Sequence, residues 1–279
     1  MRIARSILHI SDAERSLAFY AGALGMALSH RGQAAGETVL RLAYPRRHAS
    51  SPTELELRHR PPPPHVADHD HAPKGEHSYW KIGVTLADID LARARLQARG
   101  VDVSEPLQFE DIGYLCHLAD PDGHVIELLQ HRFAANYVPV TPRDDTPLGS
   151  DATFGQISLR VKNAETALDF YRERLGLTLL SRQSVPRRRF TLYFLSAVAD
   201  TPPDPDLEAV ANREWLWQRP YTTLELQHRW EAQDASAAWA PSDSAALGFA
   251  GMVIETAALP PGTLNDPDGN RVIIEAPPA

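Results

Sequence analysis

Residues 120–127 read DPDGHVIE, and a related stretch, DPDGNRVIIE, occupies residues 266–275. Proline presets the backbone for a turn, and glycine supplies the positive φ that closes it. The apolar residues that follow each turn predict a β-strand. Each copy is therefore predicted to be a β-hairpin whose second strand carries a carboxylate.

Two further segments recur in the same order as the hairpins. Residues 15–20 (RSLAFY), followed by a Leu-Gly pair, match residues 166–171 (TALDFY), and residues 55–60 (LELRHR) match residues 224–229 (LELQHR). Three matched segments in one order indicate an internal duplication. A chain of 279 residues is long enough for two domains. Proline and glycine in residues 136–150 predict a linker, so we expect domains at 1–135 and 151–279.

Composition limits the class of protein. The formal net charge is −8, which disfavours a nucleic-acid groove. The single cysteine, Cys116, excludes an internal disulfide and fits a reducing compartment. No apolar run approaches ~20 residues, and the N-terminus lacks the apolar core of a signal peptide. We expect a cytoplasmic protein whose partner is a small molecule, neither a nucleic acid nor a membrane.

The strand, the helix with Phe-Tyr and Leu-Gly, and the DPDG hairpin resemble the vicinal oxygen chelate superfamily. That group includes glyoxalase I, fosfomycin and bleomycin resistance proteins and extradiol dioxygenases. The resemblance covers nearly the whole chain and implies an α+β fold of paired βαβββ modules that curl around a cleft, in two tandem domains. The fourth module has only residues 257–262 (AALPPG) where a helix belongs, and prolines do not continue a helix.

The resemblance also implies metal ligands on the first and fourth strands of each module. The fourth-strand carboxylates are present as Glu56, Glu127 and Glu225. The first-strand position, usually His, holds Arg5, Lys81 or Gln156 in the first three modules. Arg and Lys offer no lone pair to a divalent ion at neutral pH. We therefore expect no metal cofactor, and a Lys81 ammonium that replaces the ion beside Glu56 and Glu127.

Strand alternation predicts one functional face in the first domain. The residues expected on it are His9, Glu56, Lys81, His117 and Glu127. The hairpin register places His117 opposite Glu127, with Cβ atoms ~5 Å apart. Such a pair suits a general base, so His117 and Glu127 are the catalytic candidates, and the other three are substrate-binding candidates.

Several alternatives stay open for these residues. The charged groups are equally explained as a plain salt-bridge network, and His117 as a histidine bonded to a neighbouring strand. A displaced site for Zn, Ni or Mn would use His9, Glu56, His117 and Glu127. A tract with His65, His69, His71 and His77 is either a metal tract or an exposed connector between modules.

We expect a glyoxalase-like lyase or isomerase that acts by proton transfer on a small organic molecule. The alternative is a metal-independent binding protein for an antibiotic or metabolite, similar to the bleomycin resistance proteins. Extradiol cleavage is not expected, because Gln156 and Ile273 stand at ligand positions of the second domain. Without its helix, the fourth module should bury Val253, Val272 and Ile274 under the 200–220 insertion or under a second subunit of a homodimer.

Overall fold

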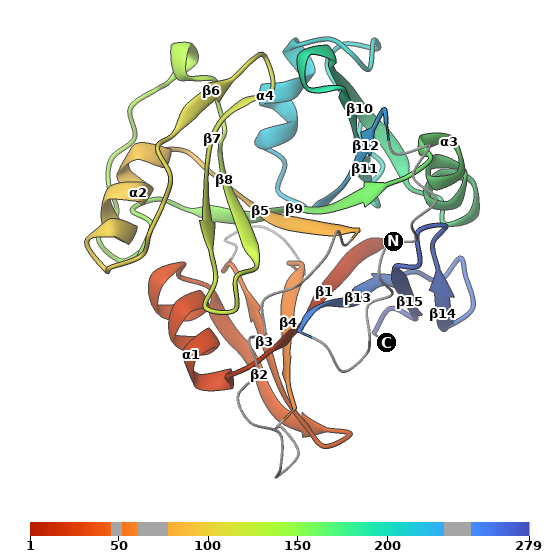
Figure 1. Ribbon diagram of the computed structural model, residues 1–279, viewed down its shortest axis with the longest axis horizontal. Coiled ribbons are helices and arrows are strands. Elements are labelled where there is room, and N and C mark those ends of the chain that lie inside the picture. Colours follow the sequence, from red (N-terminus) through yellow and green to blue (C-terminus); the bar gives the residue numbers. More distant parts are fainter. Residues whose placement is uncertain (46–51, 61–77, 232–246, 279) are drawn as a thin grey trace.

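The computed structural model describes residues 1–45, 52–60, 78–231 and 247–278 (Figure 1). The four histidines of the predicted tract lie outside these ranges. Modules one and two comprise β1 (Arg2–Ile10), α1 (Ala13–Leu17), the π-helix η1 (Ala18–Ala23), β2 (Ala27–Ala34), β3 (Glu37–Ala43), β4 (Glu54–His59), β5 (Tyr79–Leu86), α2 (Ile89–Gln97), β6 (Leu107–Phe109), β7 (Gly113–Ala119), β8 (Val125–Gln130) and the 3-10 helix η2 (Ala134–Asn136).

Modules three and four follow the same plan with changes. They comprise β9 (Ala152–Val161), α3 (Ala164–Leu168), the π-helix η3 (Asp169–Arg174), β10 (Thr178–Val185), the 3-10 helix η4 (Pro186–Arg188), β11 (Phe190–Ser196), α4 (Ala211–Trp217), β12 (Thr223–Arg229), β13 (Gly248–Glu255), β14 (Gly262–Asn265) and β15 (Arg271–Glu275). Among the described residues, no helix separates β13 from β14, as the two prolines predict. No helix in the described ranges is long and apolar enough to cross a membrane.

The first helix has a capping residue at its start and a glycine after its end. The Asp12 side chain accepts hydrogen bonds from the backbone N–H groups of Glu14 and Arg15, which caps the helix N-terminus. Gly25 follows the helix with φ of +78°, a conformation that glycine adopts at little cost. The Phe-Tyr pair lies in a π-helical turn in both duplicated copies.

The strands form two sheets, and each sheet combines modules that are distant in sequence. One sheet has the order β14-β15-β13-β1-β4-β3-β2, and the other has the order β10-β11-β12-β9-β5-β8-β7-β6. Module one therefore pairs with module four, and module two with module three. The expected α+β fold of βαβββ modules is confirmed. The pairing of successive modules within 1–135 and 151–279 is wrong, while the domain boundaries themselves stay a prediction.

The two modules of each half meet through a DPDG turn instead of through a shared sheet. The Tyr20 hydroxyl, on the first helix, donates to Asp120 Oδ2 at 2.9 Å in the hairpin of module two. The Tyr171 hydroxyl donates to Asp266 Oδ2 at 2.7 Å in the same way between modules three and four. These contacts fix each helix against its neighbouring module, which leaves β1 and β5 free to pair across the duplication.

One apolar core joins the two sheets. A single cluster of buried side chains includes Leu8, Ile82, Leu159 and Ile254, one from the first strand of each module. The fourth module is covered within the chain, since Val272 and Ile274 belong to this same cluster. Val253 packs with Ala4 and Ile7 in a smaller cluster. The expectation that the insertion or a second subunit covers them is therefore wrong. Helix α4, from the insertion, packs instead beside β10 of the eight-stranded sheet (Figure 1).

Candidate functional site

Four adjacent strands of the eight-stranded sheet, in the order β12-β9-β5-β8, bring four polar side chains together. They are Glu225, Gln156, Lys81 and Glu127, each 1–4% exposed. Gly83 lies between two of them, because it pairs with Glu127 on β8 and with Gln156 on β9. A Cβ atom at Gly83 would lie 2.1 Å from Gln156 Cγ, so this glycine leaves the room in which the Gln156 side chain lies.

The Lys81 ammonium lies between the two carboxylates. Lys81 Nζ is 2.6 Å from Glu127 Oε1 and 3.2 Å from Glu225 Oε2. Gln156 Nε2 donates to the same two oxygens, at 2.8 Å and 3.0 Å. The Ser158 hydroxyl also donates to Glu225 Oε2. The predicted ion pair of Lys81 with Glu127 is present, and its second partner is Glu225, not Glu56.

These contacts set the charge of each group. Burial alone would lower the pKa of Lys81, but Glu127 and Glu225 outweigh it and raise that pKa. Burial would raise the pKa of Glu127, yet the ammonium of Lys81 and the His117 ring hold it below its usual range. Burial raises the pKa of Glu225, and the Glu127 charge adds to this against the opposing effect of Lys81. Glu225 is therefore the carboxylate that takes up a proton more readily.

His117 lies on the solvent side of Glu127. The two residues are directly paired across β7 and β8, so the predicted register is confirmed. His117 Nε2 is 3.1 Å from Glu127 Oε2, and the His117 side chain is 39% exposed. A buried carboxylate that holds an accessible imidazole is an arrangement suited to proton transfer.

The four polar groups and His117 line a cavity of about 240 Å³. Its apolar walls combine aliphatic and aromatic side chains from modules two and three, and the aromatic ones are Trp80, Phe109, Phe190, Phe194 and Trp217. Trp217 reaches the cavity from α4, and its Nε1 donates to the carbonyl of Ile112 at 2.9 Å. The insertion of module three therefore closes one side of the cavity, a role that the sequence pattern does not predict.

Two predicted site residues lie in the other sheet. Glu56, on β4, is 1% exposed and forms ion pairs with Arg5 (3.2 Å), Arg41 (2.9 Å) and Arg58 (2.5 Å). Burial would raise the pKa of Glu56, but the three guanidinium groups together lower it. His9, on β1, lies near Glu37, Arg58 and Arg60, and burial lowers its pKa.

The five predicted residues therefore do not share one cleft. The structure unites Lys81, His117 and Glu127, and separates them from His9 and Glu56. The displaced metal site is wrong for the same reason, because its four residues are divided between two sheets. Glu225 and Gln156 join the site instead. The sequence marks both as family ligand positions, but only the pairing of modules two and three brings them to Lys81.

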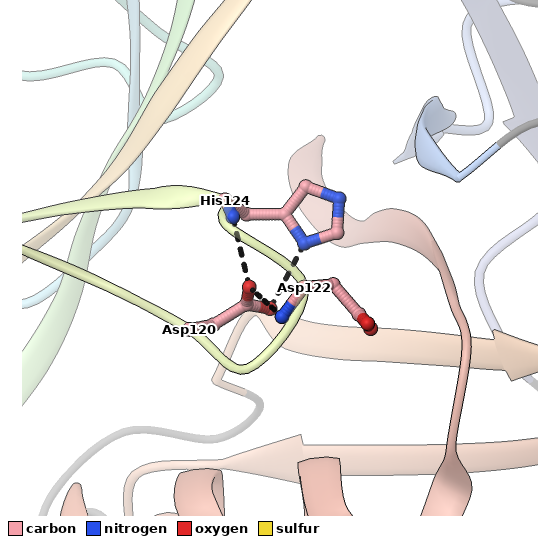
Figure 2. Close-up of side chains that lie close together, drawn as sticks. All are labelled: Asp120, Asp122 and His124. Atoms are coloured by element: carbon pink, nitrogen blue, oxygen red, sulfur yellow. Dashed lines mark hydrogen bonds and ion pairs between the residues drawn. The ribbon is translucent and has the colours of Figure 1, made fainter. Parts of the chain in front are cut away.

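A group of side chains that could hold a metal ion lies at the DPDG turn. The ligand atoms of Asp120, Asp122 and His124 lie within 4.8 Å of one another (Figure 2). These distances do not support the expectation that the protein binds no metal. Each oxygen of Asp120, however, already accepts two hydrogen bonds. Oδ1 accepts from the backbone N–H groups of Asp122 (2.9 Å) and His124 (2.8 Å), and Oδ2 from His124 Nδ1 (2.9 Å) and Tyr20 (2.9 Å).

The fourth module forms the same turn with asparagine in place of histidine. Asp266 accepts from the backbone N–H of Asn270 at 2.7 Å, and from its side-chain Nδ2 at 2.8 Å. The Asn270 amide makes the hydrogen bond that the His124 imidazole makes in module two. The structure of the turn therefore explains why Asp120, Asp122 and His124 lie together.

We expect His124→Asn to reproduce the turn of module four. The variant should fold, with a free energy of unfolding within ~1 kcal/mol of wild type, because one N–H donor to Asp120 replaces another. Zn²⁺ or Ni²⁺ should change the melting temperatures of the variant and of wild type by the same amount. A metal-dependent melting temperature in wild type that this substitution abolishes would identify a metal site at the turn.

The site at Lys81 does not suit a divalent ion. An ammonium has three donors and no lone pair, and its positive charge stands where a cation would lie between Glu127 and Glu225. The other possible ligands already form hydrogen bonds. Glu127 accepts from the Lys81 ammonium, and the Gln156 amide donates to Glu127. The chemistry available here comes from the chain's own acid, base and ammonium groups.

Comparisons with known proteins agree with this fold. Residues 2–128 match the model of the Glyoxalase/Bleomycin resistance protein/Dioxygenase superfamily. A lactoylglutathione lyase of Schizosaccharomyces pombe is 28% identical over 158 residues, which are 57% of this chain and 44% of that protein. One from Pseudomonas putida is 32% identical over 117 residues, which are 41% of this chain and 65% of that protein. The chain thus spans less than two thirds of each of these relatives.

Solved structures resemble almost the whole chain. Glyoxalase I from Zea mays has a TM-score of 0.68 at 19% identity and covers 98% of this chain and 91% of its own. A putative dioxygenase from Bacillus subtilis has a TM-score of 0.61 at 13% identity, and the match covers 100% of this chain and 86% of that protein. At such identities, the likeness establishes the fold alone.

Proposed function

We propose that this chain, whose residues 2–128 match the Glyoxalase/Bleomycin resistance protein/Dioxygenase superfamily, is a glyoxalase-like lyase or isomerase whose reaction is a proton transfer in the cavity of the eight-stranded sheet. The observation that carries the proposal is a buried ammonium between two buried carboxylates in a largely apolar cavity. The relatives named lactoylglutathione lyases support the class of reaction.

The environment assigns each group a different role. Paired carboxylates whose pKa values are pushed apart are typical of acid–base sites. Glu127, with its lowered pKa, stays ionised and orients the accessible imidazole of His117, which exchanges the proton with the ligand. Glu225, with its raised pKa, is the second group that can hold a proton.

Lys81 supplies the positive charge that stabilises negative charge on a ligand oxygen. Two of its three N–H donors serve Glu127 and Glu225, which leaves one for a ligand. A preorganised cation in a dry cavity stabilises a developing oxyanion without reorganisation of solvent. In this proposal no metal takes part, and Lys81 holds the place that the ion occupies elsewhere in the family.

Deuterium exchange tests the proposal. Lactoylglutathione and its phenyl analogue S-mandeloylglutathione each carry a C–H bond next to a carbonyl, and we expect the protein to exchange that hydrogen with D₂O for at least the aryl probe. His117→Ala should lower the exchange rate about 10²-fold to 10⁴-fold, the usual range for a general acid–base group. Proton NMR measures the rate. His30→Ala, at an exposed position of β2, is the matched control.

The alternative is a small-molecule binding protein with no turnover. The aromatic walls favour it, because they suit the capture of an apolar ligand as well as they suit a reaction. Tight binding of a probe without exchange, and with no effect of His117→Ala on its binding, would favour this alternative over the lyase.

A further inference from the structure

The cavity carries an unequal distribution of charge between its depth and its mouth. At its depth, Glu127 and Glu225 offset the charge of Lys81, so this end carries no excess positive charge to hold an anionic ligand. Among the residues that the structure describes, these two glutamates are the only acidic residues that line it, and Lys81 and Arg188 are the only Lys or Arg residues that do so.

Arg188 lies at the mouth. It belongs to η4, in the turn between β10 and β11, and is exposed, whereas Lys81 is only 2% exposed. Within the described part of the chain, Arg188 takes part in no ion pair, unlike its neighbour Arg189, which lies 2.8 Å from Glu231. Its guanidinium is the uncompensated cation of the cavity, and its fork of donors matches a carboxylate.

Aromatic side chains line the walls between mouth and depth. Phe109 from β6 and Phe190 from β11 have nearly parallel rings, with an angle of 5° between their planes and centroids 6.5 Å apart. Trp217 and Phe194 meet edge to face, with an angle of 75° between their planes and centroids 5.1 Å apart. Aromatic faces favour a ring stacked against them over an aliphatic chain of equal size. The volume of about 240 Å³ limits the part of the ligand inside the cavity to a small group.

We propose that the cavity binds a small planar aromatic acid, with its ring between the aromatic walls and its carboxylate at Arg188. This inference rests on the proposed function only in taking the cavity as the functional site, and it names the class of ligand. The carboxylate faces the cation of the mouth and stays away from Glu127 and Glu225. A polar atom on the far side of the ring would then face Lys81 and His117.

Calorimetric titration with 2-naphthoate tests the inference. We expect 2-naphthoate to bind up to about fivefold more tightly than 2-naphthamide, its uncharged counterpart, because fivefold is the upper end of the range for an exposed ion pair. Arg188→Gln should remove this difference. Arg187→Gln, one residue away and outside the cavity lining, should keep it. Decahydro-2-naphthoate, similar in size but not flat, should bind more weakly than 2-naphthoate.

Each contrary result would overturn a particular part of the inference about the ligand. Equal affinity for the acid and the amide, or an equal effect of Arg187→Gln and Arg188→Gln, would remove the role of Arg188. Equal affinity for the flat and saturated acids would remove the aromatic selectivity, and no binding of 2-naphthoate at millimolar concentration would overturn the inference as a whole. Because these are binding constants without turnover, failure of the proposed reaction would show separately, as absent deuterium exchange with binding intact.

Discussion

Lys81→Met should destabilise the protein by ~3–5 kcal/mol, the usual cost of removing one partner from a buried ion pair. The substitution removes the only ammonium between Glu127 and Glu225, and leaves two buried carboxylates close to each other. For a chain of this size, the melting temperature should fall by about 10 °C. Thermal and urea unfolding measure the change.

The sign of the pH dependence distinguishes this explanation from a general packing defect. In Lys81→Met, the folded-state pKa of the glutamates should rise above the unfolded value, so the folded protein binds more protons. The stability of the variant is then highest below pH ~4.5 and falls as pH rises through the folded-state pKa. We therefore expect a larger deficit at pH 8 than at pH 5. A deficit that is equal at both pH values would contradict the assigned charges.

Glu56→Gln should also destabilise the protein more near neutral pH than in acid, but for a different reason. The change leaves Arg5, Arg41 and Arg58 without their shared carboxylate. We expect a loss of ~3 kcal/mol, at the lower end for a buried pair, because Arg41 and Arg58 remain about one-third exposed to water.

The pKa of Glu56 is lowered in the folded protein, so its contribution is present above the unfolded pKa and lost as pH falls through the folded one. Wild type and Glu56→Gln should therefore converge in stability in acid and differ most near neutral pH. The same variant should bind 2-naphthoate as wild type does, because Glu56 lies in the other sheet. Impaired binding would mean that the two sheets are coupled, and would contradict the separation of the two clusters.

The local structure could be predicted from the sequence because it depends on neighbouring residues. The DPDG turn fixes the hairpin through backbone geometry, and the register that pairs His117 with Glu127 follows from the turn length. The missing helix of module four has an equally local cause, the two prolines. The family resemblance identified Lys81, Glu127, Gln156 and Glu225 as site positions, and the structure brings these four side chains together.

The pairing of modules could not be predicted in this way. Alternation shows that Glu56 and Glu127 each face one side of a strand, but it does not show which strand lies beside β1 or β5. The neighbouring strand that each one meets is decided by contacts of large sequence separation, such as Ile3 with Ile254 and Ile82 with Ile157. Pairing across the duplication replaces Glu56 with Glu225 as the second partner of Lys81. The role of Trp217 was missed because an insertion has no counterpart in the repeat.

The most direct test of the central claim is the number of metal ions bound per chain by wild type and by Lys81→His. The substitution restores the imidazole that the family resemblance implies, beside Glu127, Gln156 and Glu225. After incubation with Ni²⁺ or Zn²⁺ and gel filtration, wild type should retain almost no metal, whereas Lys81→His should retain about one ion per chain, because imidazole and carboxylates suit these ions. One ion retained by wild type and lost in Glu127→Gln would contradict the claim that the Lys81 ammonium takes the place of the metal.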